Sequence, residues 1–175
     1  MNPDKCHPHH HPGHQSGPAG YYWRDYTGEI PEDAFPGGHD LNSKPTYIGQ
    51  AFLEGEGVIP TTLYPGQAGL NLPCNWKVNY SDISMKILCT SNRNSLSWEN
   101  TTSQELLSTI TGRRAVIGGH QRRGKLYVGR VMHQGELLVG KIHSNEPLLG
   151  IMYYVGSNKE IDIKSYQVLV QNSCK

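Results

Sequence analysis

The sequence predicts an all-β fold built from two tandem, homologous β repeats. Ala34–His39 and Ala115–His120 both end in Gly-Gly-His, about eighty positions apart, and later blocks recur in the same order. Glycine is abundant at 20 residues, and tyrosine outnumbers phenylalanine by 10 to 2. This composition is typical of turn-rich β structure with polar-tipped aromatic side chains.

The recurring blocks divide the chain into a tail, residues 1–20, and two units, residues 21–96 and 97–175. They are Tyr47–Ala51 with Tyr127–Val131, Gly55-Glu56 with Gly135-Glu136, and Ser84–Leu88 with Ser165–Leu169. Units of this size are marginally stable alone, so we expect them to pack on each other. The first half is acidic and the second basic, which either favours their docking or reflects two solvated surfaces.

The tail is rich in Pro, Gly and His and almost free of apolar residues, so we expect it to be disordered. Imidazole and thiolate groups bind Zn²⁺, Ni²⁺ and Cu²⁺, which predicts either adventitious metal affinity or a specific metal role there. No cofactor is expected to be required elsewhere. The candidate metal ligands are Cys6, His7, His9, His10, His11 and His14.

Whole-chain features favour a globular protein with no membrane span. Hydrophobic residues make up 36% and charged residues 18%, and no long apolar run occurs. The first residues lack the apolar segment of a secretory signal, so we expect a cytoplasmic protein or one exported without a standard signal. The four cysteines, Cys6, Cys74, Cys89 and Cys174, allow three pairings and would be reduced in the cytosol.

Alternating side chains predict the strands, beginning after Tyr21. The clearest is Lys125–His133, and its counterpart in the first unit is Thr46–Leu53. Further strands are expected at Ile151–Val155, Ile161–Ile163 and Tyr166–Val170.

Two features interrupt these strands. The glycine pairs Gly37-Gly38 and Gly118-Gly119 are expected between strands, where the backbone turns tightly or approaches another group closely. Thr102–Glu105 has the spacing of a capping box ahead of Leu106, which favours one short helix there.

Polar residues recur beside the repeated glycines and one strand further along. A short Asp after a glycine turn either presents two acceptor oxygens to vicinal hydroxyls or caps its own turn. Lys141 either donates to a ligand or is simply solvated, and its first-unit counterpart is Thr61. The candidate sugar-binding residues are His39, Asp40, Glu56, Thr61, His120, Gln121, Glu136 and Lys141.

Other functional classes find little support in the sequence. It contains no phosphate-cradling loop, nucleophile elbow or His-Glu-x-x-His motif, so we do not expect an enzyme. Arg113-Arg114 and Arg122–Lys125 form a basic cluster, but only Tyr127 lies near it to stack on a base. We therefore expect no nucleic-acid partner.

In its repeated sequence blocks the chain resembles the DM-nine repeat family of invertebrate proteins. The second unit carries the closer match, with Gly118–His120, Leu126–Arg130, Gly140–Ile142 and Tyr166–Leu169 in family order. The resemblance implies two β repeats packed about a pseudo-twofold axis, mannose recognition and a role in innate immunity. It also implies that the aspartate after Gly-Gly-His and the lysine of Gly-Lys hydrogen-bond the sugar.

Neither unit holds that full pair. The first keeps Asp40 but has Thr61, and the second keeps Lys141 but has Gln121. Both sites are then weakened, retuned for another ligand, or replaced by one composite site of Asp40 and Lys141. We expect a non-enzymatic, mannose-type lectin-like protein that binds glycans and can form a homodimer. The alternative is a β-repeat scaffold with a decayed sugar site, which binds a protein partner or, through its tail, a metal.

Overall fold

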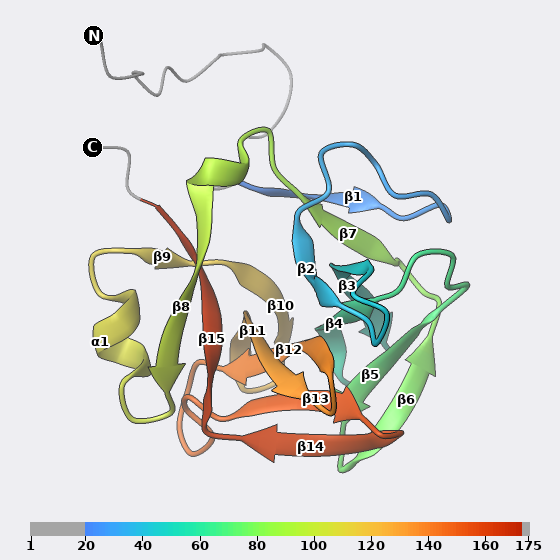
Figure 1. The fold of residues 1–175 in the computed structure, drawn as a ribbon. Helices are drawn as coiled ribbons and strands as arrows, with labels where there is room; N and C mark the ends of the chain where they lie inside the picture. The colour runs from blue at the N-terminus through green and yellow to red at the C-terminus, as the bar shows by residue number, and fades with distance from the viewer. Residues whose placement is uncertain (1–19, 173–175) are drawn as a thin grey trace, which may run out of the picture.

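The computed structural model describes residues 20–172 and confirms the all-β class (Figure 1). The first half of the chain contains seven strands. They are β1 (Tyr22–Asp25), β2 (Pro36–His39), β3 (Pro45–Leu53), β4 (Gly57–Leu63), β5 (Leu70–Cys74), β6 (Lys77–Ser81) and β7 (Lys86–Cys89).

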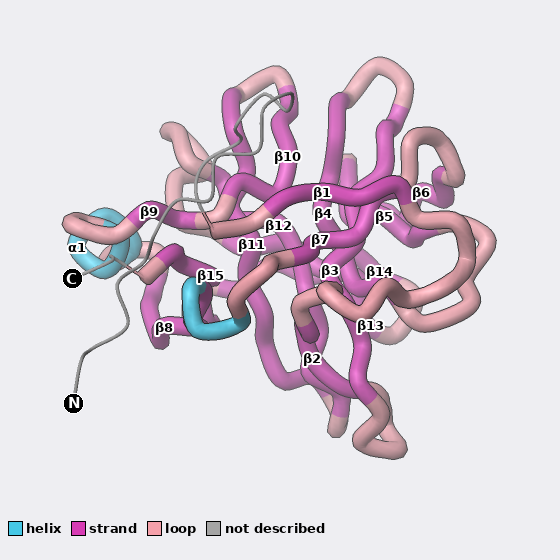
Figure 2. The backbone as a smooth tube through the Cα atoms, turned by 90° about the horizontal axis from the view of Figure 1, so that it is seen from above, coloured by secondary structure: helices cyan, strands magenta, loops and turns pink. Residues whose placement is uncertain are grey.

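The second half adds eight strands and two short helical segments. The strands are β8 (Leu96–Thr102), β9 (Arg114–Ala115), β10 (Ile117–Gln121), β11 (Gly124–His133), β12 (Glu136–His143), β13 (Met152–Gly156), β14 (Lys159–Ile163) and β15 (Ser165–Gln171). A 3₁₀ turn, η1 (Arg93–Ser95), precedes β8, and the helix α1 (Leu106–Ile110) follows it at the periphery (Figure 2). In the part of the chain described, no helix has the length and apolar character needed to cross a membrane.

Six strands form a closed ring that joins the two repeats. The strands β2-β3-β4 and β10-β11-β12 each form an antiparallel meander. The meanders then exchange edges, because β2 pairs with β12 and β4 pairs with β10. Neither meander therefore closes without the other.

Both glycine pairs lie inside strands, not between them as the sequence predicted. Gly38 is in β2 and Gly119 in β10, and each faces the backbone of the other repeat. A Cβ on Gly38 would lie 2.0 Å from the Leu137 carbonyl oxygen, and one on Gly119 would lie 2.1 Å from that of Val58. The expected close approach is confirmed, and its cause is pairing between repeats.

Equivalent side chains of the two repeats lock these strands in place. Gln50 Nε2 donates to the Gly118 carbonyl oxygen at 2.6 Å. Arg130 Nη1, from the matching position of β11, donates to the Gly37 carbonyl oxygen at 3.1 Å. Each repeat thus donates a side-chain hydrogen bond to a buried carbonyl of the other, at the glycine where the strand register shifts.

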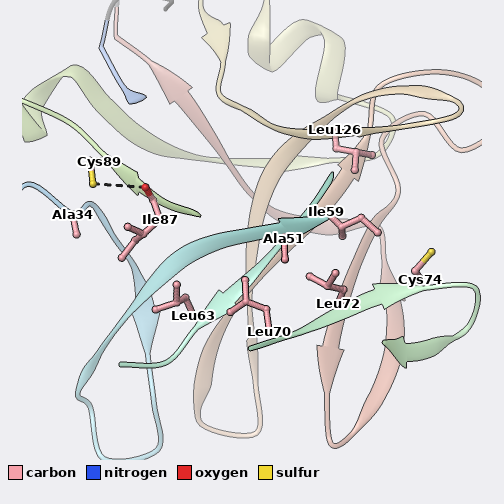
Figure 3. Close-up of a cluster of buried hydrophobic side chains, with 10 residues drawn as sticks. All are labelled: Ala34, Ala51, Ile59, Leu63, Leu70, Leu72, Cys74, Ile87, Cys89 and Leu126. Carbon is pink, nitrogen blue, oxygen red and sulfur yellow. Dashed lines mark hydrogen bonds between the residues drawn. The ribbon is translucent and has the colours of Figure 1, made fainter. Parts of the chain in front are cut away.

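Apolar packing also crosses between the repeats. One cluster of buried side chains contains Ile48 and Leu88 from the first half and Val128 and Leu169 from the second. A second cluster centres on β3–β5 of the first half and includes Leu126 from β11 (Figure 3). The structure therefore has a shared core.

The predicted strands are confirmed as β3, β11, β13, β14 and β15, and the predicted short helix is α1. The Thr102 hydroxyl accepts a hydrogen bond from the Glu105 backbone nitrogen at 3.2 Å, as the capping pattern indicates. Glu105 itself makes no side-chain capping bond. Cys74 and Cys89 are both free, buried thiols at opposite ends of the cluster in Figure 3. The predicted disordered tail, with Cys6, and Cys174 lie outside the described residues.

Replacing Gly119 with alanine will destabilise the fold by about 2 kcal/mol or more, because the new Cβ meets a backbone oxygen that has no room to move. Gly55→Ala is the matched control. Gly55 has φ +79° but open space around it, so this change carries only the left-handed penalty of about 1 kcal/mol. Urea unfolding measures both, and equal losses would contradict the close approach as the reason for the glycine.

Candidate functional site

A cavity of about 560 Å³, here called the seam pocket, opens between the two repeats. The β5–β6 hairpin of the first repeat contacts β13 and β14 of the second and forms one wall. The lining residues are Glu56, Cys74, Asn75, Trp76, Gln121, Arg122, Arg123, Lys141, His143, Leu148, Tyr153 and Glu160.

Lys141 lies at the floor of the seam pocket. It is on β12 and only 3% exposed, and its Nζ donates to Gln121 Oε1 at 2.8 Å. The same Nζ lies 5.7 Å from the centroid of the Tyr153 ring. Burial lowers the pKa of Lys141, while Cys74, Glu160 and Glu56 oppose that shift. Its ammonium group has three donors, so two remain for a ligand.

Two carboxylates flank the lysine, and they differ in the hydrogen bonds that they already accept. Glu56 Oε1 accepts a hydrogen bond from Asn75 Nδ2 at 2.7 Å. Glu160 Oε2 is buried, and no residue in the described range hydrogen-bonds it. Burial raises the pKa of Glu160, while the charge of Lys141 and hydrogen bonds from the Lys77 and Trp76 backbones act in the opposite direction. These backbone hydrogen bonds stabilise the carboxylate, and its Oε2 remains open to a donor from a ligand.

An exposed indole forms the outer wall. Asn75 and Trp76 join β5 to β6 with φ values of 55° and 63°, the left-handed pair of a type I′ hairpin turn. Trp76 remains 74% exposed, and its ring meets Tyr153 edge-on with centroids 5.9 Å apart. A tryptophan with left-handed backbone angles destabilises the fold by about 1 kcal/mol, so the exposed position of this ring comes with a loss of stability.

A second, smaller cavity of about 260 Å³ also lies between the repeats, with their roles exchanged; we call it the reciprocal pocket. Its lining residues are Thr61, Thr62, Tyr64, Gln67, Asn71, Glu136, Leu138, Val155, Gly156, Ser157 and Asn158. Thr61 donates its hydroxyl to the Asn71 carbonyl oxygen at 2.8 Å, and Tyr64 donates to Glu136 Oε1 at 3.0 Å. The hairpin turn here is Ser157-Asn158, so it presents no aromatic ring.

The structure separates the predicted sugar-binding residues into three groups. Lys141, Gln121 and Glu56 meet in the seam pocket, whereas Thr61 and Glu136 line the reciprocal pocket. The remaining three, Asp40, His39 and His120, line neither pocket.

Asp40 has a structural role instead. Its Oδ1 accepts hydrogen bonds from the backbone nitrogens of Asn42 at 2.8 Å and Lys44 at 2.9 Å. This is the turn-capping alternative that the sequence left open. Lys141 lines the seam pocket and Asp40 does not, so the two residues of the predicted composite site share no described pocket.

Sequence reasoning missed Trp76, Tyr153 and Glu160. The Asn75-Trp76 step between alternating segments is the one signal that could have indicated a hairpin turn carrying an exposed ring. Within residues 20–172, no group of His, Cys, Asp and Glu is arranged to hold a metal ion. The predicted tail ligands lie outside that range, so the metal site stays a prediction.

Comparisons with known proteins agree with this architecture. A model of the DM9 repeat matches residues 40–157. The crystal structure of the nematode sperm cell motility protein MFP2B is similar, with a TM-score of 0.63 and 13% identity. The match covers 93% of this chain and 50% of that one, so this chain spans half of MFP2B and shares its fold. No curated protein sequence matches the chain.

His143 predicts a pH dependence of stability. Burial first, then the charges of Lys141 and Arg123, lower the pKa of His143 from 6.5 to about 4. Between these pH values His143 binds a proton in the unfolded chain but not in the folded chain. The free energy of unfolding therefore falls as the pH drops from 6.5 to 4, by up to about 1.4 kcal/mol per pH unit. Urea unfolding of wild type and His143→Gln across this range will show a shallower slope in the variant. An equal pH dependence of stability in wild type and variant would contradict the assignment of this effect to His143.

Proposed function

The chain belongs to the DM9 repeat family, and we propose that it is a non-enzymatic carbohydrate-binding protein of the mannose-binding type, acting in innate immune recognition. One observation carries the proposal. The seam pocket joins a buried lysine, hydrogen-bonded to a half-buried glutamine, to an exposed indole.

The polar floor of the pocket suits vicinal hydroxyl groups. Each sugar hydroxyl both donates and accepts, so a ring needs convergent donors and acceptors. Lys141 supplies donors, and Glu56 and Glu160 supply acceptors around it. The unpartnered Oε2 of Glu160 gains a hydrogen bond when a hydroxyl reaches it.

The wall of the pocket suits the apolar face of a pyranose. Trp76 offers a large, exposed ring whose position is fixed by the hairpin turn and by Tyr153. Covering such a ring buries apolar area at little conformational cost, because the ring is already oriented. A cavity of about 560 Å³ has the size typical of small-molecule sites.

The Cys74 thiol in the lining of the pocket also fits binding without chemistry. Burial raises the pKa of the Cys74 thiol, which keeps it in the weakly nucleophilic, protonated form. Gln121 Nε2 donates a hydrogen bond to the Cys74 sulfur at 3.6 Å, so the thiol helps to orient the glutamine side chain.

Lys141→Met and Trp76→Ala will each weaken mannan binding. Lys141→Met keeps the buried stem but removes the charged donors, with an expected loss of roughly tenfold or more. Trp76→Ala removes the stacking ring, with an expected loss of about five- to tenfold. Mannan pull-down and calorimetry with mannose measure both effects.

Tyr80→Ala is the matched control, since Tyr80 is 62% exposed on the same hairpin but does not line the seam pocket. It should bind as wild type does. A wild type that binds no glycan, or a Lys141→Met variant with unchanged affinity, would refute the proposed function.

A further inference from the structure

The charged side chains of the seam pocket are unevenly distributed between its floor and its rim. At the floor, Lys141 lies with Glu56 and Glu160, and both carboxylates act on the pKa of the lysine. At the rim, Arg122 and Arg123 are exposed, and neither forms an ion pair with any residue of the described range 20–172. The ion pairs of residues 20–172 are Arg24–Asp33, Lys86–Asp25 and Arg113–Glu99.

The two rim arginines are held in a fixed turn. Gln121 pairs with Gly124 across the end of the β10–β11 hairpin, so Arg122 and Arg123 form its two-residue loop. Asn145 Nδ2 donates to the Arg123 carbonyl oxygen at 2.8 Å. The backbone that carries both guanidinium groups is therefore positioned before any ligand arrives.

The charge of Arg123 is directed into the pocket. This charge adds to the lowering of the pKa of His143 and opposes the rise that burial causes in the pKa of Tyr153, and both side chains line the pocket. Arg122 lines the same cavity. Two adjacent guanidinium groups therefore face the opening above the floor where the proposed function places a sugar ring.

A neutral sugar leaves these two groups unused. A planar guanidinium group binds phosphate, sulfate and carboxylate oxygens through paired, charge-assisted hydrogen bonds. We infer that the natural ligand of the seam pocket is an acidic saccharide, whose ring lies on Lys141 and Trp76 and whose anionic group lies on Arg122 and Arg123. This inference rests on the proposed function, because it names the ligand class of the same pocket.

The reciprocal pocket provides an internal contrast. Glu136 is the one charged residue in its lining, so an anion entering it would be repelled. The acidic saccharide should therefore bind once per chain.

Calorimetric titration of the full chain with mannose, mannose 6-phosphate, glucuronate and inorganic phosphate tests the inference. At least one acidic sugar should bind about tenfold or more tightly than mannose, at a single site, with affinity that falls as salt is added. In the Arg122→Gln/Arg123→Gln double variant, the affinity for that acidic sugar should fall to within about twofold of the variant's own affinity for mannose. Lys125→Gln is the control, because it removes a cation from the same turn region outside the seam pocket.

The outcomes separate the two proposals. Acidic sugars that bind no more tightly than mannose would overturn the inference and leave the proposed function standing. Inorganic phosphate that binds as tightly as mannose 6-phosphate would also overturn it, because the rim would then be a bare anion site. Absence of binding by every sugar would refute the proposed function itself.

Discussion

The structure depends on the exchange of strand edges between its two repeats. The Gly-Gly strands, β2 and β10, each lie against the other repeat at a distance that excludes a Cβ atom. Gln50 and Arg130 then hydrogen-bond the glycine carbonyls across the same boundary. Because the ring of six strands closes only through these pairings, the shared core and both pockets exist only when the repeats are joined.

This shared framework explains how two similar repeats produce two dissimilar pockets. The hairpins β5–β6 and β13–β14 have the same left-handed turn geometry, but one turn presents Asn75-Trp76 and the other Ser157-Asn158. The strand positions that match are Lys141 in the seam pocket and Thr61 in the reciprocal pocket. A duplicated backbone therefore keeps its fold through glycine and core contacts, while the pocket side chains are free to diverge.

The sequence predicted the class and the main strands because their signals are local. Alternation over nine or ten residues indicated β3 and β11, and repetition of the blocks strengthened both assignments. Lys141, Gln121 and Glu56 were found because they follow repeated motifs, and the structure brings all three to the seam pocket.

The features that sequence reasoning missed depend on contacts between distant segments. Glycine pairs usually indicate turns, and only the partner strand reveals that Gly38 and Gly119 are needed for close packing. Asp40 was paired with Lys141 because each repeat lacks one member of the motif. Because the two repeats exchange strand edges, equivalent positions of the repeats lie in separate pockets. Asp40 itself caps its own turn.

The two repeats form one cooperative unit, and splitting the chain after Asn92 tests this most directly. Residues 1–92 and 93–175 would be produced separately and mixed, with cooperative unfolding and sugar binding measured for each sample. The account predicts that neither fragment unfolds cooperatively alone and that the equimolar mixture recovers both properties. A fragment that unfolds cooperatively alone, at the midpoint of the intact protein, would contradict it.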